Sequence, residues 1–152
     1  MRMRSLGGDG PEVTYVPCDL ADTLERADDV VDGLLGDWRP EDIALLTTGS
    51  RHDEQVSRQD LLGQDGYWDT FWDEDQVFYG HVLGFKGLER KVVVLAANES
   101  GERERSRERL YVGLSRATDK LVVVGPPDLV TAIGGPEVAK RLGIDEALRQ
   151  KN

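Results

Sequence analysis

The chain has 152 residues, of which 39% are hydrophobic and 32% are charged, a composition typical of one globular domain. Its formal net charge of −10 argues against a free-standing nucleic-acid binder. The charge is uneven, because residues 1–80 hold six Lys and Arg against nineteen Asp and Glu, whereas residues 81–152 hold thirteen against ten. We therefore expect any anionic ligand on the second half of the chain.

Cysteine content and hydropathy predict the cellular compartment. Cys18 is the one cysteine, so the chain can form no internal disulfide, and a cysteine-based zinc site is not expected. No apolar stretch approaches the ~20 residues that cross a bilayer, and no apolar segment follows the charged start of the sequence as in a signal peptide. These features predict a cytoplasmic protein without membrane contact.

The first part of the chain contains a lead-in, a strand, a helix and a second strand. Residues 1–12 are rich in glycine and polar side chains, which predicts a flexible lead-in. Residues 13–18 predict a strand, and residues 21–38 predict an amphipathic helix because apolar side chains recur at spacings of three and four. The nearly unbroken apolar run at 42–48 predicts a strand buried on both faces.

The segment 49–75 has a weaker pattern. Its first part fits a short helix that ends at Gly63. Its second part places four aromatic side chains among acids, and we expect them to form a small local core beneath a loop. These aromatic residues are Tyr67, Trp68, Phe71 and Trp72.

The second half of the chain continues the alternation of strands and helices. Residues 77–85 and 91–97 predict two strands, residues 107–118 a helix with one apolar face, and residues 120–125 a further strand. One or two short helices are expected in the tail at 131–152. This order predicts an α/β fold, with a mostly parallel sheet and helices on its faces.

Two turns of this sheet are candidate ligand sites. In open parallel sheets, ligands gather at the carboxyl ends of the strands. We expect two turns at that end: the one at residues 86–89, and the one that leads into the helix bearing Arg116.

Motifs that would make the chain a self-sufficient enzyme are absent from its sequence. No glycine is followed by lysine, so there is no G-x-x-x-x-G-K-[ST] loop, and neither G-x-G-x-x-G nor G-x-S-x-G occurs. His52 and His81 are not spaced as a metal-binding pair, and the acid run at 73–75 is better explained as solvated surface. We therefore expect no metal site and no complete active site.

The first candidate site is the segment Lys86-Gly87-Leu88-Glu89. A glycine lets backbone approach a ligand closely, a lysine can meet a phosphate, and a carboxylate can accept hydrogen bonds from sugar hydroxyls. The combination suits a nucleotide. Taken alone, an ordinary turn with a surface ion pair is the simpler interpretation.

The second candidate site is Arg116, near the C-terminal end of the predicted helix. A guanidinium forks onto phosphate oxygens and could stabilise a transferring phosphoryl group as an arginine finger. Taken alone, a cation that interacts favourably with a helix C-terminus, by about 0.3–1 kcal/mol, is again the simpler interpretation.

The two segments together resemble a known family. The sequence "HVLGFKGLE", an aliphatic strand and then "RERLYVGLSRATDKLVVVG" resemble motifs V and VI in the C-terminal motor domain of superfamily 1 DNA helicases of the UvrD/Rep/PcrA type. The segment "DIALLTTGSRHDEQ" resembles a strand and helix of the same domain. The resemblance covers about residues 13–125. It implies a RecA-like three-layer α/β/α domain at 13–130, with 49–75 as a short replacement for the family's usual inserted domain.

The resemblance assigns roles to the candidate nucleotide-binding residues. It implies that Arg116 reaches the γ-phosphate of ATP and that Glu89 accepts a hydrogen bond from the ribose. Lys86 and Gly87 match residues that line the same cleft.

The resemblance also implies contacts with single-stranded DNA near the strand ends. The implied DNA-binding residues are Thr47, Thr48, His81 and Gly84. The sequence departs from the family here, because His81 stands where threonine is usual and Leu83 where histidine is usual. Thr47 or Thr48 stands near the family's usual arginine.

The family's P-loop, Mg²⁺ carboxylates and water-orienting groups belong to an N-terminal motor domain that this sequence does not contain. The resemblance therefore implies the C-terminal half of an ATP-dependent DNA helicase or translocase. ATP and Mg²⁺ would be held by a partner, the N-terminal P-loop motor domain, and this half alone would be inactive. The alternative is a non-catalytic protein-interaction module derived from a helicase domain, whose acidic first half docks a basic partner.

Overall fold

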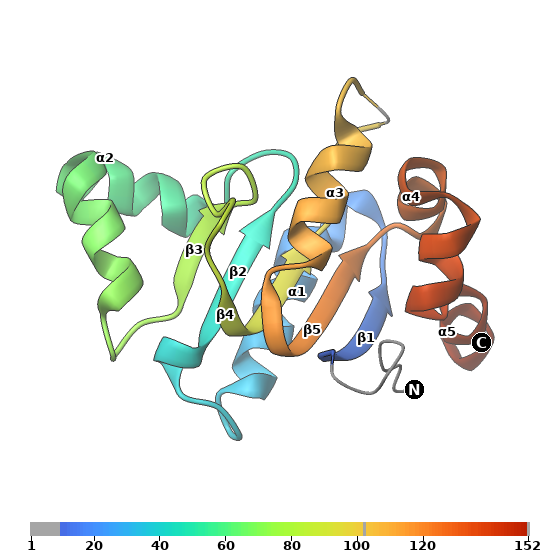
Figure 1. The fold of residues 1–152 in the computed structure, drawn as a ribbon, viewed down its shortest axis with the longest axis horizontal. Coiled ribbons are helices and arrows are strands. Elements are labelled where there is room, and N and C mark those ends of the chain that lie inside the picture. Colours follow the sequence, from blue (N-terminus) through green and yellow to red (C-terminus); the bar gives the residue numbers. More distant parts are fainter. Residues whose placement is uncertain (1–9, 102, 152) are drawn as a thin grey trace.

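The computed structural model describes residues 10–101 and 103–151, so most of the lead-in predicted at 1–12 lies outside the described residues. Within this part of the chain, five strands form one sheet in the order β1-β5-β4-β2-β3 (Figure 1). The strands are β1 (Glu12–Pro17), β2 (Ile43–Thr47), β3 (Phe78–His81), β4 (Arg90–Ala96) and β5 (Ala117–Gly125). Every neighbouring pair is parallel, as the alternation of elements predicted.

Helices cover both faces of the sheet (Figure 1). They are α1 (Thr23–Leu34), α2 (Asp53–Asp69), α3 (Ser106–Leu114), α4 (Pro127–Leu142) and α5 (Ile144–Lys151). Helix α1 packs its apolar stripe against one face, whereas α3, α4, α5 and the end of α2 pack on the other. The predicted three-layer α/β/α architecture is confirmed and is consistent with a RecA-like fold.

The central strands are apolar because both of their faces are covered. Residues 43–46 of β2 and 92–96 of β4 are all 0% exposed. Parallel strands that are buried on both faces need no alternation of polar and apolar side chains. The aliphatic runs in the sequence therefore located these two strands closely.

The connection from β3 to β4 contains no helix. The strand predicted at 77–85 spans only Phe78–His81, and residues 82–89 cross a face of the sheet instead. Val82 and Phe85 are both 0% exposed and lie in the same apolar cluster as β3 and β4. The segment 82–89 therefore begins at the carboxyl ends of the strands and finishes at their amino ends.

Helix α2 and the aromatic residues that follow it depart from the sequence prediction. The helix breaks at Gly63, where φ is 72°, and then resumes up to Asp69. Tyr67 and Phe71 join the main core beside Phe78, so the prediction of a separate small core was wrong. The aromatic pattern could not show that these rings reach the strands across the sheet face.

Helix α3 is shorter than predicted and lies close to β4. It ends at Leu114, and β5 begins at Ala117, because the chain must turn back into the sheet. A Cβ on Gly113 would lie 2.5 Å from Leu95 Cδ1, so a side chain at this position would push α3 away from the sheet.

The C-terminal helices pack on the same core as α3. Helix α4 breaks at Gly135, where φ is 82°, directly before Pro136, and Val130, Ile133 and Leu142 contribute to the core. In the part of the chain that the structure describes, no helix is both long enough and apolar enough to span a bilayer.

Candidate functional site

The predicted site residues fall into two groups at opposite ends of the sheet. Thr47 and His81 end β2 and β3 at the carboxyl end, whereas Glu89 and Arg116 come directly before β4 and β5 at the amino end. The expectation for the turn that leads into α3 is confirmed, because this turn follows β4 at the carboxyl end. The expectation for the turn at 86–89 was wrong, because the connection 82–89 crosses the sheet face and finishes at the amino end of β4. Arg116 lies at the amino end as well, because helix α3 runs back to the start of β5.

At the amino end, Arg116 lies beside the residue that precedes Glu89. Its Nη1 donates to the Leu88 carbonyl at 3.2 Å, and its own carbonyl accepts from the Arg90 amide at 3.1 Å. Glu89 is exposed and Arg116 is half-buried. The structure thus brings together the two residues that the resemblance placed on one nucleotide.

The guanidinium of Arg116 has few partners. Its Nε and Nη2 contact the Ser115 hydroxyl at 3.2 and 2.9 Å. Across residues 10–101 and 103–151, no carboxylate lies within ion-pair distance of it. A guanidinium has five N–H donors, so this one retains donors and an unneutralised charge for a ligand.

Lys86 and Gly87 lie on the surface between the two ends. Lys86 Nζ is 3.8 Å from Glu108 Oε1, and both side chains are largely exposed, so this pair contributes little stability. Gly87 has a φ of 85° with no atom near the position of a Cβ, so it is needed for its backbone conformation rather than for close packing.

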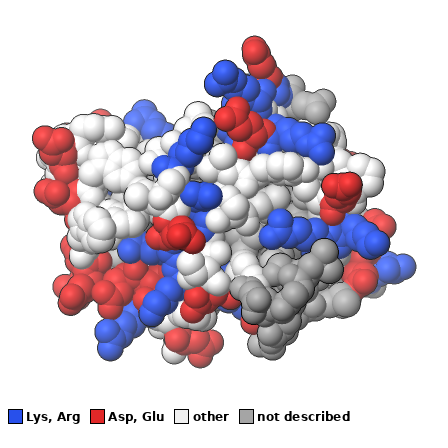
Figure 2. Space-filling view, viewed as in Figure 1, with Lys and Arg blue, Asp and Glu red and all other residues white. Residues whose placement is uncertain are grey.

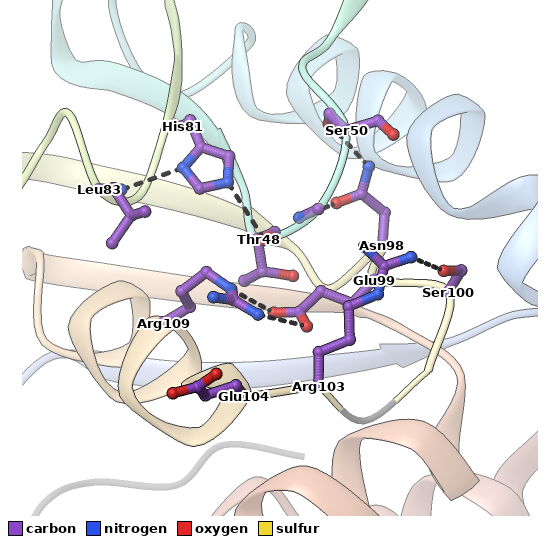
Figure 3. Close-up of a pocket in the computed structure, with 11 residues that line it drawn as sticks. Thr48, Ser50, His81, Leu83, Asn98, Glu99, Ser100, Arg103, Glu104 and Arg109 are labelled. Atoms are coloured by element: carbon purple, nitrogen blue, oxygen red, sulfur yellow. Dashed lines mark hydrogen bonds and ion pairs between the residues drawn. The ribbon is translucent and has the colours of Figure 1, made fainter.

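At the carboxyl end, a cleft of about 490 Å³ opens above β2, β3 and β4 (Figure 3). Thr48 and His81 line it. Thr47 is 0% exposed, and its side chain does not line the cleft. Gly84 is exposed but does not line the cleft.

His81 is held in the wall of this cleft as a neutral ring. Its Nδ1 accepts from the Leu83 amide at 3.2 Å, and its Nε2 lies 3.1 Å from the Thr48 carbonyl, so Nε2 carries the hydrogen. Burial lowers the pKa of His81 below its ordinary 6.5, against the opposing effect of the bond to Thr48. His81 therefore contributes a fixed, neutral ring to the wall of the cleft, rather than a positive charge, near neutral pH.

A buried ion pair forms the floor of the cleft. Both oxygens of Glu99 accept from Arg109, at 2.9 and 3.0 Å (Figure 3). The Ser106 hydroxyl donates to the same carboxylate at 2.5 Å. The Glu99 side chain is 3% exposed. Burial alone would raise the pKa of Glu99, but the hydrogen bonds from Arg109 and Ser106 outweigh it, so the pKa lies below its ordinary value.

Sequence reasoning missed this ion pair, because no expected helix or strand covered residues 98–106. The available signal was an acid directly after a buried strand, followed by serine and arginine in the first turns of the next helix. The pair ties the end of β4 to the start of α3 and so fixes the helix that leads to Arg116.

The loops after β2 and β4 close against each other at the same end. The Asn98 side chain accepts from the Gly49 amide at 2.8 Å and donates to the Ser50 carbonyl at 3.0 Å. A Cβ on Gly49 would lie 2.6 Å from the Asn98 carbonyl oxygen. The cleft is therefore built by close backbone approach and by an amide bridge.

The two histidines do not form a metal site. His52 caps α2, since its Nδ1 accepts from the Glu54 amide at 2.9 Å, and its Nε2 lies 2.7 Å from Asp28 Oδ1. Among the described residues, no group of three or more His, Cys, Asp and Glu could hold a metal ion.

Comparison with known proteins agrees with the two motifs. Residues 81–124 match the family described as UvrD-like helicase C-terminal domain. These residues include the segment 82–89, all of α3 and most of β5. No curated protein sequence matches the chain. Over residues 81–124 the chain is therefore similar to the C-terminal domain of UvrD-like, superfamily 1 helicases, and this similarity indicates part of a helicase.

Proposed function

We propose that the chain is the C-terminal motor half of an ATP-dependent DNA helicase or translocase. In this proposal Arg116 contacts the γ-phosphate of ATP, and Glu89 accepts a hydrogen bond from the ribose. Lys86 and Gly87 border the same cleft. An N-terminal P-loop motor domain holds the triphosphate and its Mg²⁺, and the present chain alone does not hydrolyse ATP.

The position of Arg116 carries the proposal. Its guanidinium lies at the open amino end of the sheet, bonded to the carbonyl beside Glu89, and has no carboxylate partner among the described residues. A buried or neutralised arginine could not stabilise the charge that develops on transferring phosphoryl oxygens. An arginine finger supplied in this way is worth about 10³-fold or more in rate.

The carboxyl-end cleft is the proposed contact with single-stranded DNA. Thr48 and His81 line it, and Arg103 adds a charged guanidinium on its rim. Gly84 remains in the proposal as an exposed backbone position near His81. Binding of this kind involves phosphates and stacked bases and is largely independent of sequence.

The two sites suggest how ATP turnover would move DNA. Lobe closure around ATP would bring the P-loop lobe against the amino end of this sheet, and lobe opening would follow hydrolysis. Helix α3 runs from the cleft to Arg116, so one rigid element would carry motion between them. We also place the protein in a reducing, cytoplasmic compartment, where the buried thiol of Cys18 stays free.

The test is ATP hydrolysis by the helicase assembled with its P-loop lobe. Arg116→Ala should lower DNA-stimulated kcat by about 10³-fold or more, with single-stranded DNA affinity changed less than about twofold. Arg116→Lys should recover little, because an ammonium cannot fork onto two oxygens. Arg105→Ala is the matched control, since that arginine side chain is 75% exposed.

Unchanged turnover in Arg116→Ala would refute the arginine-finger assignment. The interaction-module alternative predicts a different outcome, in which a basic protein binds the acidic first half and no Arg116 variant affects turnover.

A further inference from the structure

The most exposed aromatic side chain among the described residues is Trp72, at 79%. It ends the short 3-10 helix η3 (Thr70–Trp72) that follows α2. We propose that Trp72 is the platform on which the base of the bound nucleotide stacks. This inference rests on the proposed function, because it extends the same nucleotide site by one residue.

Arg90 connects η3 to the other nucleotide-binding residues. The Arg90 Nη2 donates to the Phe71 carbonyl at 2.8 Å, and its Cζ lies 4.2 Å from the centre of the Phe71 ring. The Arg90 amide donates to the Arg116 carbonyl at 3.1 Å, and Arg90 directly follows Glu89. One residue thus contacts both the neighbour of Trp72 and Arg116. In Figure 1 the end of α2 and the starts of β4 and β5 lie at the same, lower end of the sheet.

The turn that carries Trp72 is held firmly. The Thr70 hydroxyl donates to the Tyr67 carbonyl at 2.6 Å, and Phe71 is 8% exposed in the core. The Phe71 and Trp72 rings meet edge to face, with centres 4.7 Å apart. A ring fixed in this way loses little conformational freedom when a base binds, so the stacking energy is largely retained.

The charges around Trp72 determine which end of a nucleotide it can take. Asp69, Asp73, Glu74 and Asp75 flank the ring in sequence, and acidic side chains gather at the lower left of Figure 2, over the end of α2 and the segment after it. Carboxylates repel a triphosphate but tolerate a base. Because Arg90 contacts both Phe71, beside Trp72, and the Arg116 backbone, and directly follows Glu89, we assign the base to Trp72, the ribose to Glu89 and the phosphate to Arg116.

Exposure alone does not distinguish Trp72 from other apolar surface residues. Leu61 is 80% exposed, but it lies in α2 before the break at Gly63. Trp72 combines a planar ring with a connection to Arg90. Base–aromatic stacking contributes about 1–3 kcal/mol per base, which corresponds to about 5- to 150-fold in affinity.

The experiment follows the tryptophan indole N–H signals of this chain, assembled with its P-loop lobe and labelled in this chain only, by NMR while ligands are added to millimolar concentration. Three probes separate the parts of a nucleotide: adenosine, inorganic tripolyphosphate and ATP. The signal of Trp72 should move with adenosine and ATP but not with tripolyphosphate. The signal of Trp38, which packs on the far face of the sheet, should not move with any of them.

Variants then test the energetic contribution. Trp72→Ala should weaken ATP binding by about 5- to 150-fold, and Trp72→Phe should recover part of the loss. Leu61→Ala, the matched exposed control on α2, should leave ATP affinity unchanged. Arg116→Ala should weaken ATP binding while the shift caused by adenosine remains.

Each other outcome overturns a specific claim. If ATP binds and Arg116→Ala weakens it, while the Trp72 signal stays still, stacking is wrong and the proposed function stands. If adenosine moves the Trp72 signal and Arg116→Ala has no effect on ATP, stacking stands and the phosphate contact is wrong. No shift of Trp72 with any probe overturns the stacking site. Loss of turnover in Trp72→Ala at unchanged nucleotide affinity would instead identify a contact with the P-loop lobe.

Discussion

Arg109 and Arg116 lie seven positions apart, one in α3 and one just past its end, yet their guanidinium groups have different surroundings. Arg109 makes two hydrogen bonds to the buried carboxylate of Glu99, and its side chain is 16% exposed. Arg116 contacts a carbonyl and a serine hydroxyl, without a carboxylate partner in the described parts of the chain. The first arginine is neutralised within the fold, whereas the second keeps its charge.

The same difference separates the two ends of the sheet. At the carboxyl end, Asn98, Glu99 and His81 bond to neighbouring groups and build a cleft. At the amino end, Glu89 and Trp72 are exposed and bond to few groups. Internally satisfied polar groups fix a shape, whereas groups without internal partners are available to a ligand. The comparison therefore predicts that mutations at the two ends act on different properties.

The largest expected effect on stability comes from breaking the ion pair between Glu99 and Arg109. Glu99→Ala or Arg109→Ala leaves an uncompensated buried charge, so each should lower the free energy of unfolding by about 3–5 kcal/mol. Arg116→Ala should change it by less than about 0.5 kcal/mol. Urea unfolding of the three variants measures both values. Equal losses in Arg109→Ala and Arg116→Ala would abolish the distinction between the two arginines.

The pH dependence of unfolding should show separately how much the ion pair of Glu99 contributes to stability. The folded pKa of Glu99 lies below its ordinary 4.5, so its contribution to stability is fully present above about pH 4.5. That contribution is lost as pH falls through the lowered pKa, because the unfolded state takes up a proton on this carboxylate at a higher pH than the folded state does. The stability difference between the wild type and Glu99→Gln should be constant from pH 7 to pH 5 and shrink below. A difference that grows on acidification would contradict the assignment.

A smaller loss of stability is expected from a substitution at the contact between α3 and β4. In Gly113→Ala the new Cβ would meet Leu95 at 2.5 Å, and relief of this contact should cost about 1–3 kcal/mol of stability. Gly101→Ala is the control, since no atom lies within 4 Å of its Cβ position. Gly113 is three residues from Arg116, so Gly113→Ala should also reduce turnover of the assembled helicase. Full activity in a destabilised Gly113→Ala would show that the placement of Arg116 tolerates movement of α3.

The sequence predicted the strands and layers well, because patterns of buried residues are local. The aliphatic runs of β2, β4 and β5 located the centre of the sheet, and the helix spacing located α1. Local pattern could not show that residues 82–89 cross the sheet face, because Phe85 fits either a strand or a buried crossing. Its ring packs against Phe71 of η3 and Phe78 of β3, and local periodicity does not reveal these contacts.

The candidate site was predicted only in part, because a sequence motif identifies residues but not their contacts with distant segments. Arg116 and Glu89 were identified from motif resemblance, and the structure places them together. The end of the sheet at which Glu89 lies was predicted wrongly, since a general rule about carboxyl ends ignored the direction of the connection 82–89. The pair of Glu99 and Arg109 was missed, because the partners are ten residues apart. The sequence of a charged segment also does not show whether its charges are exposed to solvent or form a buried ion pair.

The smallest expected effect on stability comes from Gly87, in the connection 82–89 that joins the carboxyl and amino ends of the sheet. Gly87 has a φ of 85° and open space around it, so Gly87→Ala should cost about 1–2 kcal/mol of stability from the left-handed backbone alone. Gly33→Ala, in helix α1 with equally open space, should instead stabilise by about 0.5–1 kcal/mol. Thermal unfolding would show these opposite signs. If Gly87→Ala also raised the KM for ATP beyond its effect on folding, the ligand would approach this backbone closely, and the open amino end would extend from Arg116 to Gly87.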